Sequence, residues 1–174
     1  MQMPTLKPSK GLPEGASFWH PATLIATWFG VGLLPKMPGT FGSLAALPIA
    51  WVLADRFGPY AVAGAGLALF FIGLWASGVY LRQTRTEDPG EIVVDEVSAQ
   101  LIACAPAGLD PLGFALAFVL FRIFDIMKPW PISALERGLP GALGVMADDA
   151  AAALFTAALV ILFYVILERP SVFF

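Results

Sequence analysis

The stretch Tyr60–Leu81, YAVAGAGLALFFIGLWASGVYL, is 22 residues long and contains no charged side chain. A helix of about 20 apolar residues is long enough to cross the hydrocarbon core of a bilayer. Its glycines at 64, 66, 73 and 78 are small positions at which a neighbouring helix can approach closely. This stretch therefore predicts a membrane-spanning helix that packs against other helices.

The composition of the whole chain agrees with a membrane protein. Of its 174 residues, 58% are hydrophobic and only 13% are charged, whereas about 25% are charged in soluble domains. The length corresponds to about one domain. The net charge of −3 and the lack of a basic stripe give no indication of a nucleic-acid partner.

Further apolar segments on both sides of this stretch extend the prediction to a bundle. The five predicted spans lie near residues 43–57, 59–81, 92–106, 111–127 and 149–167. We therefore expect an all-α integral membrane helical bundle with about four to five membrane helices.

An interfacial helix is expected before the first span. Residues 18–34 are apolar but interrupted by polar residues, and they carry Trp19 and Trp28, which suit the headgroup level. Residues 1–17 are expected to form a flexible polar tail, and 18–174 a single membrane-embedded domain.

The distribution of basic residues predicts which side of the membrane each connection faces. One face receives Lys7, Lys10, Lys36, Arg82, Arg85, Arg122, Lys128 and Arg137, and the other receives only Arg56 and Arg169. Because cytoplasmic loops carry an excess of Lys and Arg, the first face is predicted to be cytoplasmic.

Seven acidic residues that border or enter apolar runs fall on this same face: Asp88, Glu91, Asp95, Glu96, Asp125, Asp148 and Asp149. An ionised acid within or beside hydrocarbon is costly, so such residues indicate a functional site, often one that binds a metal ion. Carboxylates lining a transport pathway would be spread through the depth of the membrane. Their gathering on one side favours an interfacial enzyme over a cation-binding transporter.

Two motifs carry the acids deepest in the apolar pattern. Asp95 and Glu96 lie inside the segment that begins at Ile92, and Asp148 and Asp149 directly precede the last apolar run. Carboxylates together with phosphate oxygens are the ligands that Mg²⁺ prefers. Ordinary structural roles stay open for these acids: pairing with an arginine for the first two, and helix capping for the last two.

Two other motifs could hold a phosphate. In PGTFGS at residues 38–43, Thr40 and Ser43 lie at a predicted helix start, where anions are favoured. Arg122, Asp125 and Lys128 are spaced by three residues and so share one side of a helix. Structural alternatives are a plain helix cap for the first motif and a salt bridge from Asp125 to Arg122 or Lys128 for the second.

The single His20 and the single Cys104 limit the chemistry further. One histidine cannot build a His-based metal cage, and a lone thiol forms neither an internal disulfide nor a zinc site. We interpret His20 as a residue of the interfacial aromatic belt and Cys104 as a small packed hydrophobe.

Taken together, the motifs PGTFGS at 38–43, IVVDE at 92–96, FRIFDIMKPWPI at 121–132 and VMADD at 145–149 resemble the phosphatidylglycerophosphatase A family. The resemblance runs from about His20 to Ala153. It implies a small bacterial inner-membrane enzyme that depends on Mg²⁺ and removes the terminal phosphate of phosphatidylglycerophosphate to give phosphatidylglycerol. One departure is Gly141-Ala142, where relatives tend to have a Gly-Gly pair.

With this resemblance, the expected site faces the cytoplasm and acts on a membrane phospholipid. We expect Asp95, Glu96, Asp148 and Asp149 to hold one or two Mg²⁺ ions with assistance from Asp125, and Thr40, Ser43, Arg122 and Lys128 to hold the phosphate. The expected catalytic set is Asp95, Glu96, Asp125, Lys128 and Asp149. Asp88 and Glu91 are expected only to shape the entrance.

Several readings stay open at this point. Water activated by a carboxylate or a bound metal could attack phosphorus directly, or an aspartyl-phosphate could form first. A phosphatase for a different lipid phosphate is the main alternative enzyme. Histidine-dependent lipid phosphatases are disfavoured because only His20 is present, and CDP-alcohol phosphotransferases because their run of spaced Asp, Gly and Arg residues is absent.

Overall fold

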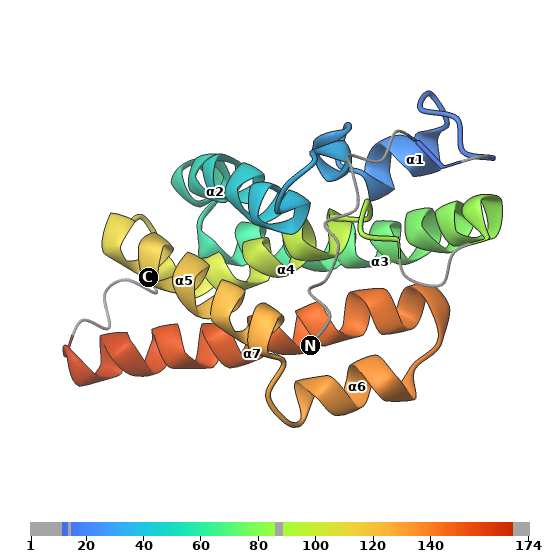
Figure 1. The fold of residues 1–174 in the computed structure, drawn as a ribbon. Helices are drawn as coiled ribbons and strands as arrows, with labels where there is room; N and C mark the ends of the chain where they lie inside the picture. Colours follow the sequence, from blue (N-terminus) through green and yellow to red (C-terminus); the bar gives the residue numbers. More distant parts are fainter. Residues whose placement is uncertain (1–11, 14, 86–88, 169–174) are drawn as a thin grey trace.

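The computed structural model describes residues 12–168, apart from residue 14 and residues 86–88. Every regular element in this part of the chain is helical, which confirms the all-α prediction (Figure 1). The helices are α1 (Pro21–Ala26), α2 (Pro38–Phe57), α3 (Pro59–Thr84), α4 (Val94–Cys104), α5 (Pro111–Met127), α6 (Ile132–Gly138) and α7 (Gly141–Ile166). Most of the predicted N-terminal tail, residues 1–11 and 14, lies outside the described residues.

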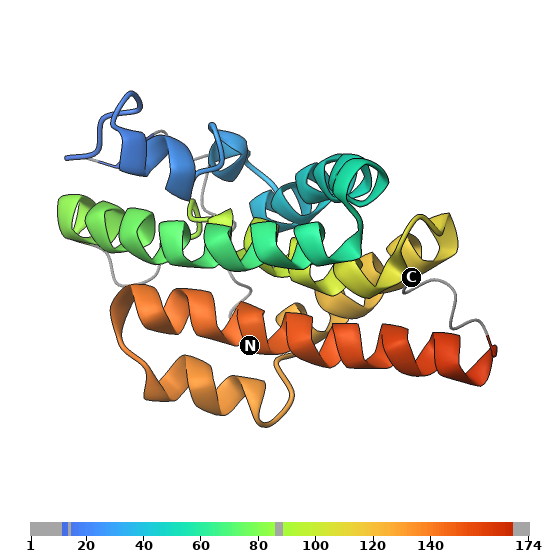
Figure 2. The same ribbon diagram turned by 180° about the vertical axis from the view of Figure 1, so that it is seen from behind.

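Two long helices, α3 and α7, form the length of the bundle. Each has 26 residues and is apolar enough to cross a membrane, and at 1.5 Å per residue each is roughly 39 Å long. They lie side by side and run in opposite directions in both ribbon views (Figures 1 and 2). The other predicted spans correspond to shorter helices, so the number of four to five membrane helices stays a prediction.

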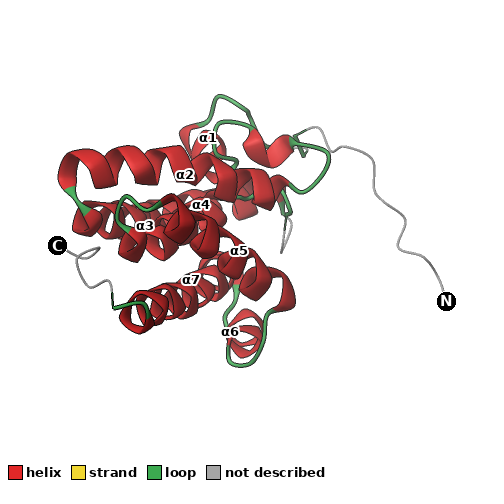
Figure 3. Cartoon of the chain, turned by 90° about the vertical axis from the view of Figure 1, so that its left-hand side faces the viewer, coloured by secondary structure: helices red, strands yellow, loops and turns green. Residues whose placement is uncertain are grey.

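The short helix α4 lies at the centre of the bundle. Nine of its eleven residues are buried, and Figure 3 shows it between α2 and α7. The predicted span at 92–106 is therefore a helix enclosed by its neighbours. This position matters for function, because the first turn of α4 carries Asp95 and Glu96 into the interior.

Close packing of α3 against its neighbours depends on particular glycines. A Cβ added at Gly66 would lie 2.7 Å from Ile102 Cγ1 on α4, and one at Gly73 would lie 2.7 Å from Met146 Cε on α7. These two glycines permit the predicted close approach. A Cβ at Gly78 would make only ordinary contacts, and Gly64 has nothing within 4 Å, so the prediction was wrong for Gly64.

Polar contacts join α5 and α7 near both of their ends. At one end, Tyr164 Oη donates a hydrogen bond of 2.7 Å to Asp110 Oδ2, and Asp110 also caps α5. Towards the other end, Lys128 Nζ lies 2.7 Å from Asp148 Oδ2. The two contacts hold the helices antiparallel, so that the end of α5 lies beside the first half of α7.

The segment expected to form an interfacial helix folds only in part as one. Its helix α1 has six residues, and its buried positions Ala22 and Ala26 belong to a core cluster with α3. His20 is the N-cap of this helix, because its Nδ1 accepts a hydrogen bond of 3.2 Å from the Ala22 backbone N–H. His20 thus caps this helix, and its place in an interfacial aromatic belt stays a prediction. Trp19 next to it is 80% exposed.

The glycine contacts predict unequal effects of one substitution at two sites in α3. Gly66→Ala should destabilise the protein by about 1–3 kcal/mol, because the new methyl group would press on the backbone of α4 at Ser98 O, 2.9 Å away. For a chain of this size, the melting temperature should fall by roughly 2–10 °C. Thermal unfolding of the purified protein in detergent would measure the shift.

Gly64→Ala is the matched control, since the same methyl group meets no atom there. Its melting temperature should equal that of the unmodified protein or exceed it slightly, because alanine is the better helix former. An equal loss of stability in both variants would contradict the packing described here.

Candidate active site

A cavity of about 360 Å³ lies where α2, α4 and the first half of α7 meet the end of α5. Five acidic residues line it, namely Asp95, Glu96, Asp125, Asp148 and Asp149, together with Lys128. The structure thus brings together five of the seven acids singled out from the sequence. Glu91 is buried outside this lining, and Asp88 lies outside the described residues.

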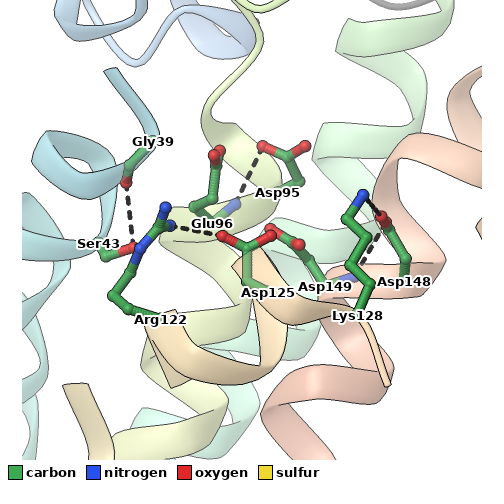
Figure 4. Close-up of polar contacts among 9 residues, drawn as sticks. All are labelled: Gly39, Ser43, Asp95, Glu96, Arg122, Asp125, Lys128, Asp148 and Asp149. Atoms are coloured by element: carbon green, nitrogen blue, oxygen red, sulfur yellow. Dashed lines mark hydrogen bonds and ion pairs between the residues drawn. The ribbon is translucent and has the colours of Figure 1, made fainter. Parts of the chain in front are cut away.

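Three of these acids converge closely enough to share a metal ion. One carboxylate oxygen from each of Asp95, Glu96 and Asp149 lies within 4.8 Å of the others, and Figure 4 shows the three side chains grouped together. Asp95 and Glu96 come from the first turn of α4, whereas Asp149 lies two turns into α7. A helix–helix contact therefore builds this carboxylate triad.

The electrostatics of the triad favour a cation. On α4, which is outside the two candidate spanning helices, burial raises the pKa of Asp95 well above its usual value, and the neighbouring Glu96 raises it further. Burial also raises the pKa of Glu96. Glu96 Oε2 and Asp149 Oδ2 are buried without a hydrogen-bond partner among the described residues. Clustered and unsatisfied carboxylates are costly to bury, and a bound cation would remove that cost.

The donor set indicates which kind of cation fits. All three candidate ligands are carboxylate oxygens, and the group contains no histidine or cysteine. Hard divalent ions such as Mg²⁺, Mn²⁺ and Ca²⁺ prefer such oxygen ligands, whereas softer metals prefer sulfur or imidazole. The residues of this site therefore fit a hard divalent ion.

Asp148 is placed differently from its sequence-predicted role as a metal ligand. It lies outside the triad, with Oδ2 at 2.7 Å from Lys128 Nζ and Oδ1 accepting a hydrogen bond of 2.9 Å from the Asp149 backbone N–H. Both aspartates lie well inside α7, which begins at Gly141, so the alternative of helix capping is wrong. Lys128 ends α5 in a left-handed conformation with φ of 42° and lines the cavity.

The other predicted phosphate-binding residues do not line the cavity. Arg122 Nη1 forms an ion pair of 2.8 Å with Asp125 Oδ2 and donates a hydrogen bond of 3.2 Å to Ser43 Oγ. Thr40 lies in the first turn of α2 and is partly buried. Of the predicted set, only Lys128 reaches the cavity, and the alternative that Asp125 pairs with Arg122 is confirmed.

Sequence reasoning did not predict the rest of the cavity lining. This part of the lining is largely apolar or glycine and includes Pro38, Gly39, Pro89, Gly90, Leu139, Gly141, Gly144 and Val145. At Gly39, an added Cβ would overlap the carboxylate of Glu96, so only glycine lets that side chain occupy its position. The glycine in PGTFGS was a signal of close approach, but its partner, 57 positions along the chain, was not predictable.

Comparison with known proteins gives consistent matches. The family model described as Phosphatidylglycerophosphatase A matches residues 24–164. A relative named Phosphatidylglycerophosphatase A from Escherichia coli is 38% identical over 141 residues, which cover 80% of this chain and 79% of the relative. One of the same name from Haemophilus influenzae is 36% identical over 146 residues, covering 80% and 86%.

A third relative, from Bacteroides thetaiotaomicron, carries a provisional name as a phosphatidylinositol-3-phosphatase. It is 36% identical over 141 residues, which cover 76% of this chain and 87% of the relative. No solved structure shows a significant match.

The triad predicts the effect of removing one of its charges. Asp149→Asn changes a candidate direct ligand. It should therefore weaken divalent-ion binding by more than the roughly 10- to 100-fold typical of losing an outer-shell partner. Mn²⁺ is a suitable probe, and its binding to the purified protein can be followed by electron paramagnetic resonance.

Asp110→Asn is the matched control, since it makes the same chemical change at the far end of the bundle. Asparagine also keeps the capping of α5, because it is an equally good N-cap. This control should bind Mn²⁺ like the unmodified protein. Undiminished Mn²⁺ binding by Asp149→Asn would exclude this residue from the metal site.

Proposed function

The chain belongs to the phosphatidylglycerophosphatase A family, and from this premise we propose that it hydrolyses the terminal phosphate of phosphatidylglycerophosphate. The products are phosphatidylglycerol and inorganic phosphate. The observation that carries this proposal is the cavity in which the carboxylate triad and Lys128 meet. Such a cavity offers both a site for a divalent ion and a fixed cation for a phosphate.

We assign the metal site to Asp95, Glu96 and Asp149, with Mg²⁺ as the ion. The fit rests on the three converging oxygens and on the two buried carboxylate oxygens that have no partner among the described residues. When bound, Mg²⁺ would polarise a phosphoryl oxygen and lower the pKa of water. We assign Asp148 the role of an ion-pair partner of Lys128, instead of the metal-binding role expected from the sequence.

Lys128 is the proposed phosphate contact of the protein. Its ammonium lines the cavity, and an ammonium group binds phosphate as a point charge. Asp148 holds this ammonium at 2.7 Å and so restricts its position. Binding the substrate phosphate beside Lys128 brings the scissile bond to the acid-lined part of the cavity.

Asp125 is the proposed proton acceptor, because it lines the cavity outside the metal-binding triad. In the reaction, the oxygen of water forms a bond to phosphorus and the bond from phosphorus to the glycerol oxygen breaks. The proton taken from water is returned to the glycerol oxygen that leaves. A carboxylate can perform both transfers when it is held close to the reacting atoms.

The proposed setting is the bacterial inner membrane, with the cavity on the cytoplasmic side. We propose that α2, α3, α5 and α7 cross the bilayer around the enclosed α4. Large apolar side chains exposed on α3, such as Phe71 at 61% and Trp75 at 51%, agree with contact to lipid. A cytoplasmic cavity would meet the headgroup phosphate of a lipid at the membrane surface.

A second candidate substrate is another lipid phosphate. The name of the Bacteroides relative favours phosphatidylinositol 3-phosphate as the compound to compare. A transporter is disfavoured, because the cavity gathers the acids at one end of the bundle and does not spread them along it.

Phosphate release by the purified protein in mixed micelles tests the activity. With Mg²⁺, phosphatidylglycerophosphate should be hydrolysed faster than phosphatidylinositol 3-phosphate. Chelation with EDTA should abolish release, and added Mg²⁺ should restore it, since the carboxylate triad needs a cation to accept an anionic substrate. Folded protein that releases no phosphate with any divalent ion would refute the proposal.

The proposed sidedness is testable with the single native cysteine removed by Cys104→Ala. In this background, Arg56→Cys and Lys36→Cys place one exposed thiol at each end of the bundle. In intact cells with a permeable outer membrane, a membrane-impermeant maleimide should label the first variant only. After lysis, the Lys36→Cys variant should be labelled as well. Labelling of Lys36→Cys but not of Arg56→Cys in intact cells would show that the orientation is opposite to the one proposed.

A further inference from the structure

Arg122 lies behind the wall of the cavity, although its position in the sequence suggested a phosphate contact. We propose that Arg122, anchored by Ser43, is a positioning residue that fixes the carboxylate of Asp125 and makes no contact with the substrate phosphate. This inference rests on the proposed function, because it assigns how the acid-lined face of that same site is held in place.

The guanidinium contacts one residue that lines the cavity and one that does not. Arg122 Nη1 lies 2.8 Å from Asp125 Oδ2 and 3.2 Å from Ser43 Oγ, and Figure 4 shows it between these two side chains. Asp125 lines the cavity, whereas Arg122 does not. Both contacts are made by Nη1, so its two N–H groups are directed at Asp125 and Ser43, and no part of Arg122 lines the cavity in which a phosphate would bind.

Ser43 is built to receive this guanidinium. Its hydroxyl donates to the Gly39 carbonyl oxygen at 3.0 Å, which leaves the lone pairs of Oγ to accept from Arg122. Ser43 is fully buried, so its hydroxyl does not exchange these partners for bulk water. Because this buried hydroxyl both donates and accepts a hydrogen bond, it holds the arginine in one orientation.

Held by Ser43, Arg122 also lies close to a second acid of the site, Glu96, besides Asp125. A Cβ at Gly39 would lie 3.5 Å from Arg122 Nη1 and would overlap the Glu96 carboxylate, so the arginine lies next to both acids. Asp125 belongs to α5, Glu96 to α4, and Ser43 to α2. One cation therefore joins the second turn of α2 to Asp125 of α5 and, lying near Glu96 of α4, offsets the mutual repulsion of these acids.

Steady-state kinetics can separate positioning from phosphate binding. Arg122→Gln should lower kcat on the order of 10- to 100-fold, as for the loss of an outer-shell partner. Its KM, and the inhibition constant of inorganic phosphate, should stay within about twofold, because an interaction that acts only in the transition state changes kcat. Lys128→Gln should instead raise both constants about tenfold or more, as expected for a lost direct contact.

A double-mutant cycle tests whether Arg122 acts through Asp125. In an Asp125→Asn background, Arg122→Gln should lower kcat by less than about a further twofold, because the group that it positions is already impaired. Independent roles would give losses that multiply.

Ser43→Ala covers the case in which Arg122→Gln does not fold, as judged by thermal unfolding. It should lower kcat in the same direction but by less, with KM unchanged. Ser77→Ala is the matched control, a buried serine of α3 outside the cavity lining, and it should retain the kinetics of the unmodified protein.

Failure of the proposed function and failure of the positioning role of Arg122 would give different results. An unmodified protein that hydrolyses no lipid phosphate would reject the proposed function. With an active unmodified protein, three results would overturn the inference: an increase in KM and in the phosphate inhibition constant for Arg122→Gln like that of Lys128→Gln, multiplicative losses in the cycle, or an unchanged kcat.

Discussion

The rest of the structure depends on five carboxylates, three buried and two partly buried, that gather where four helices of an apolar bundle meet. Such charges are stable only when cations or hydrogen bonds compensate them. Lys128 compensates Asp148 and Arg122 compensates Asp125, which leaves Asp95, Glu96 and Asp149 as a group that a divalent ion would complete. The need for that ion and the ability to accept a phosphate thus have the same electrostatic origin.

Close helix packing is what allows these charges to meet. Gly66 and Gly73 let α3 approach α4 and α7, so that a helix of only eleven residues is enclosed at the centre. The acids of its first turn then point into the bundle, and Gly39 leaves room for one of them. Small residues in apolar helices therefore have a functional consequence here, since added methyl groups would separate the helices that carry the ligands.

The sequence predicted individual elements unequally well. The span near 111–127 coincides with α5, and 59–81 lies within α3. The last span was predicted to begin at 149, but α7 begins at Gly141. Alanine, glycine and methionine before Asp148 are compatible with a helix, so the helix extends beyond the predicted span into the flanking motif. For residues 92–106, hydrophobicity could not distinguish a helix that faces lipid from one enclosed by other helices.

The sequence by itself determined the all-helical class, the family and the five acids that line the cavity. Apolar length, residue type and motif order can all be read along the chain without knowing how the helices pack. Only the tertiary structure decided the partners: Asp148 with Lys128, Arg122 with Asp125 and Ser43, and Asp149 with the acids of α4. The physical reason is that these contacts join different helices. Their distances follow from how the helices pack, and no spacing along one helix contains that information.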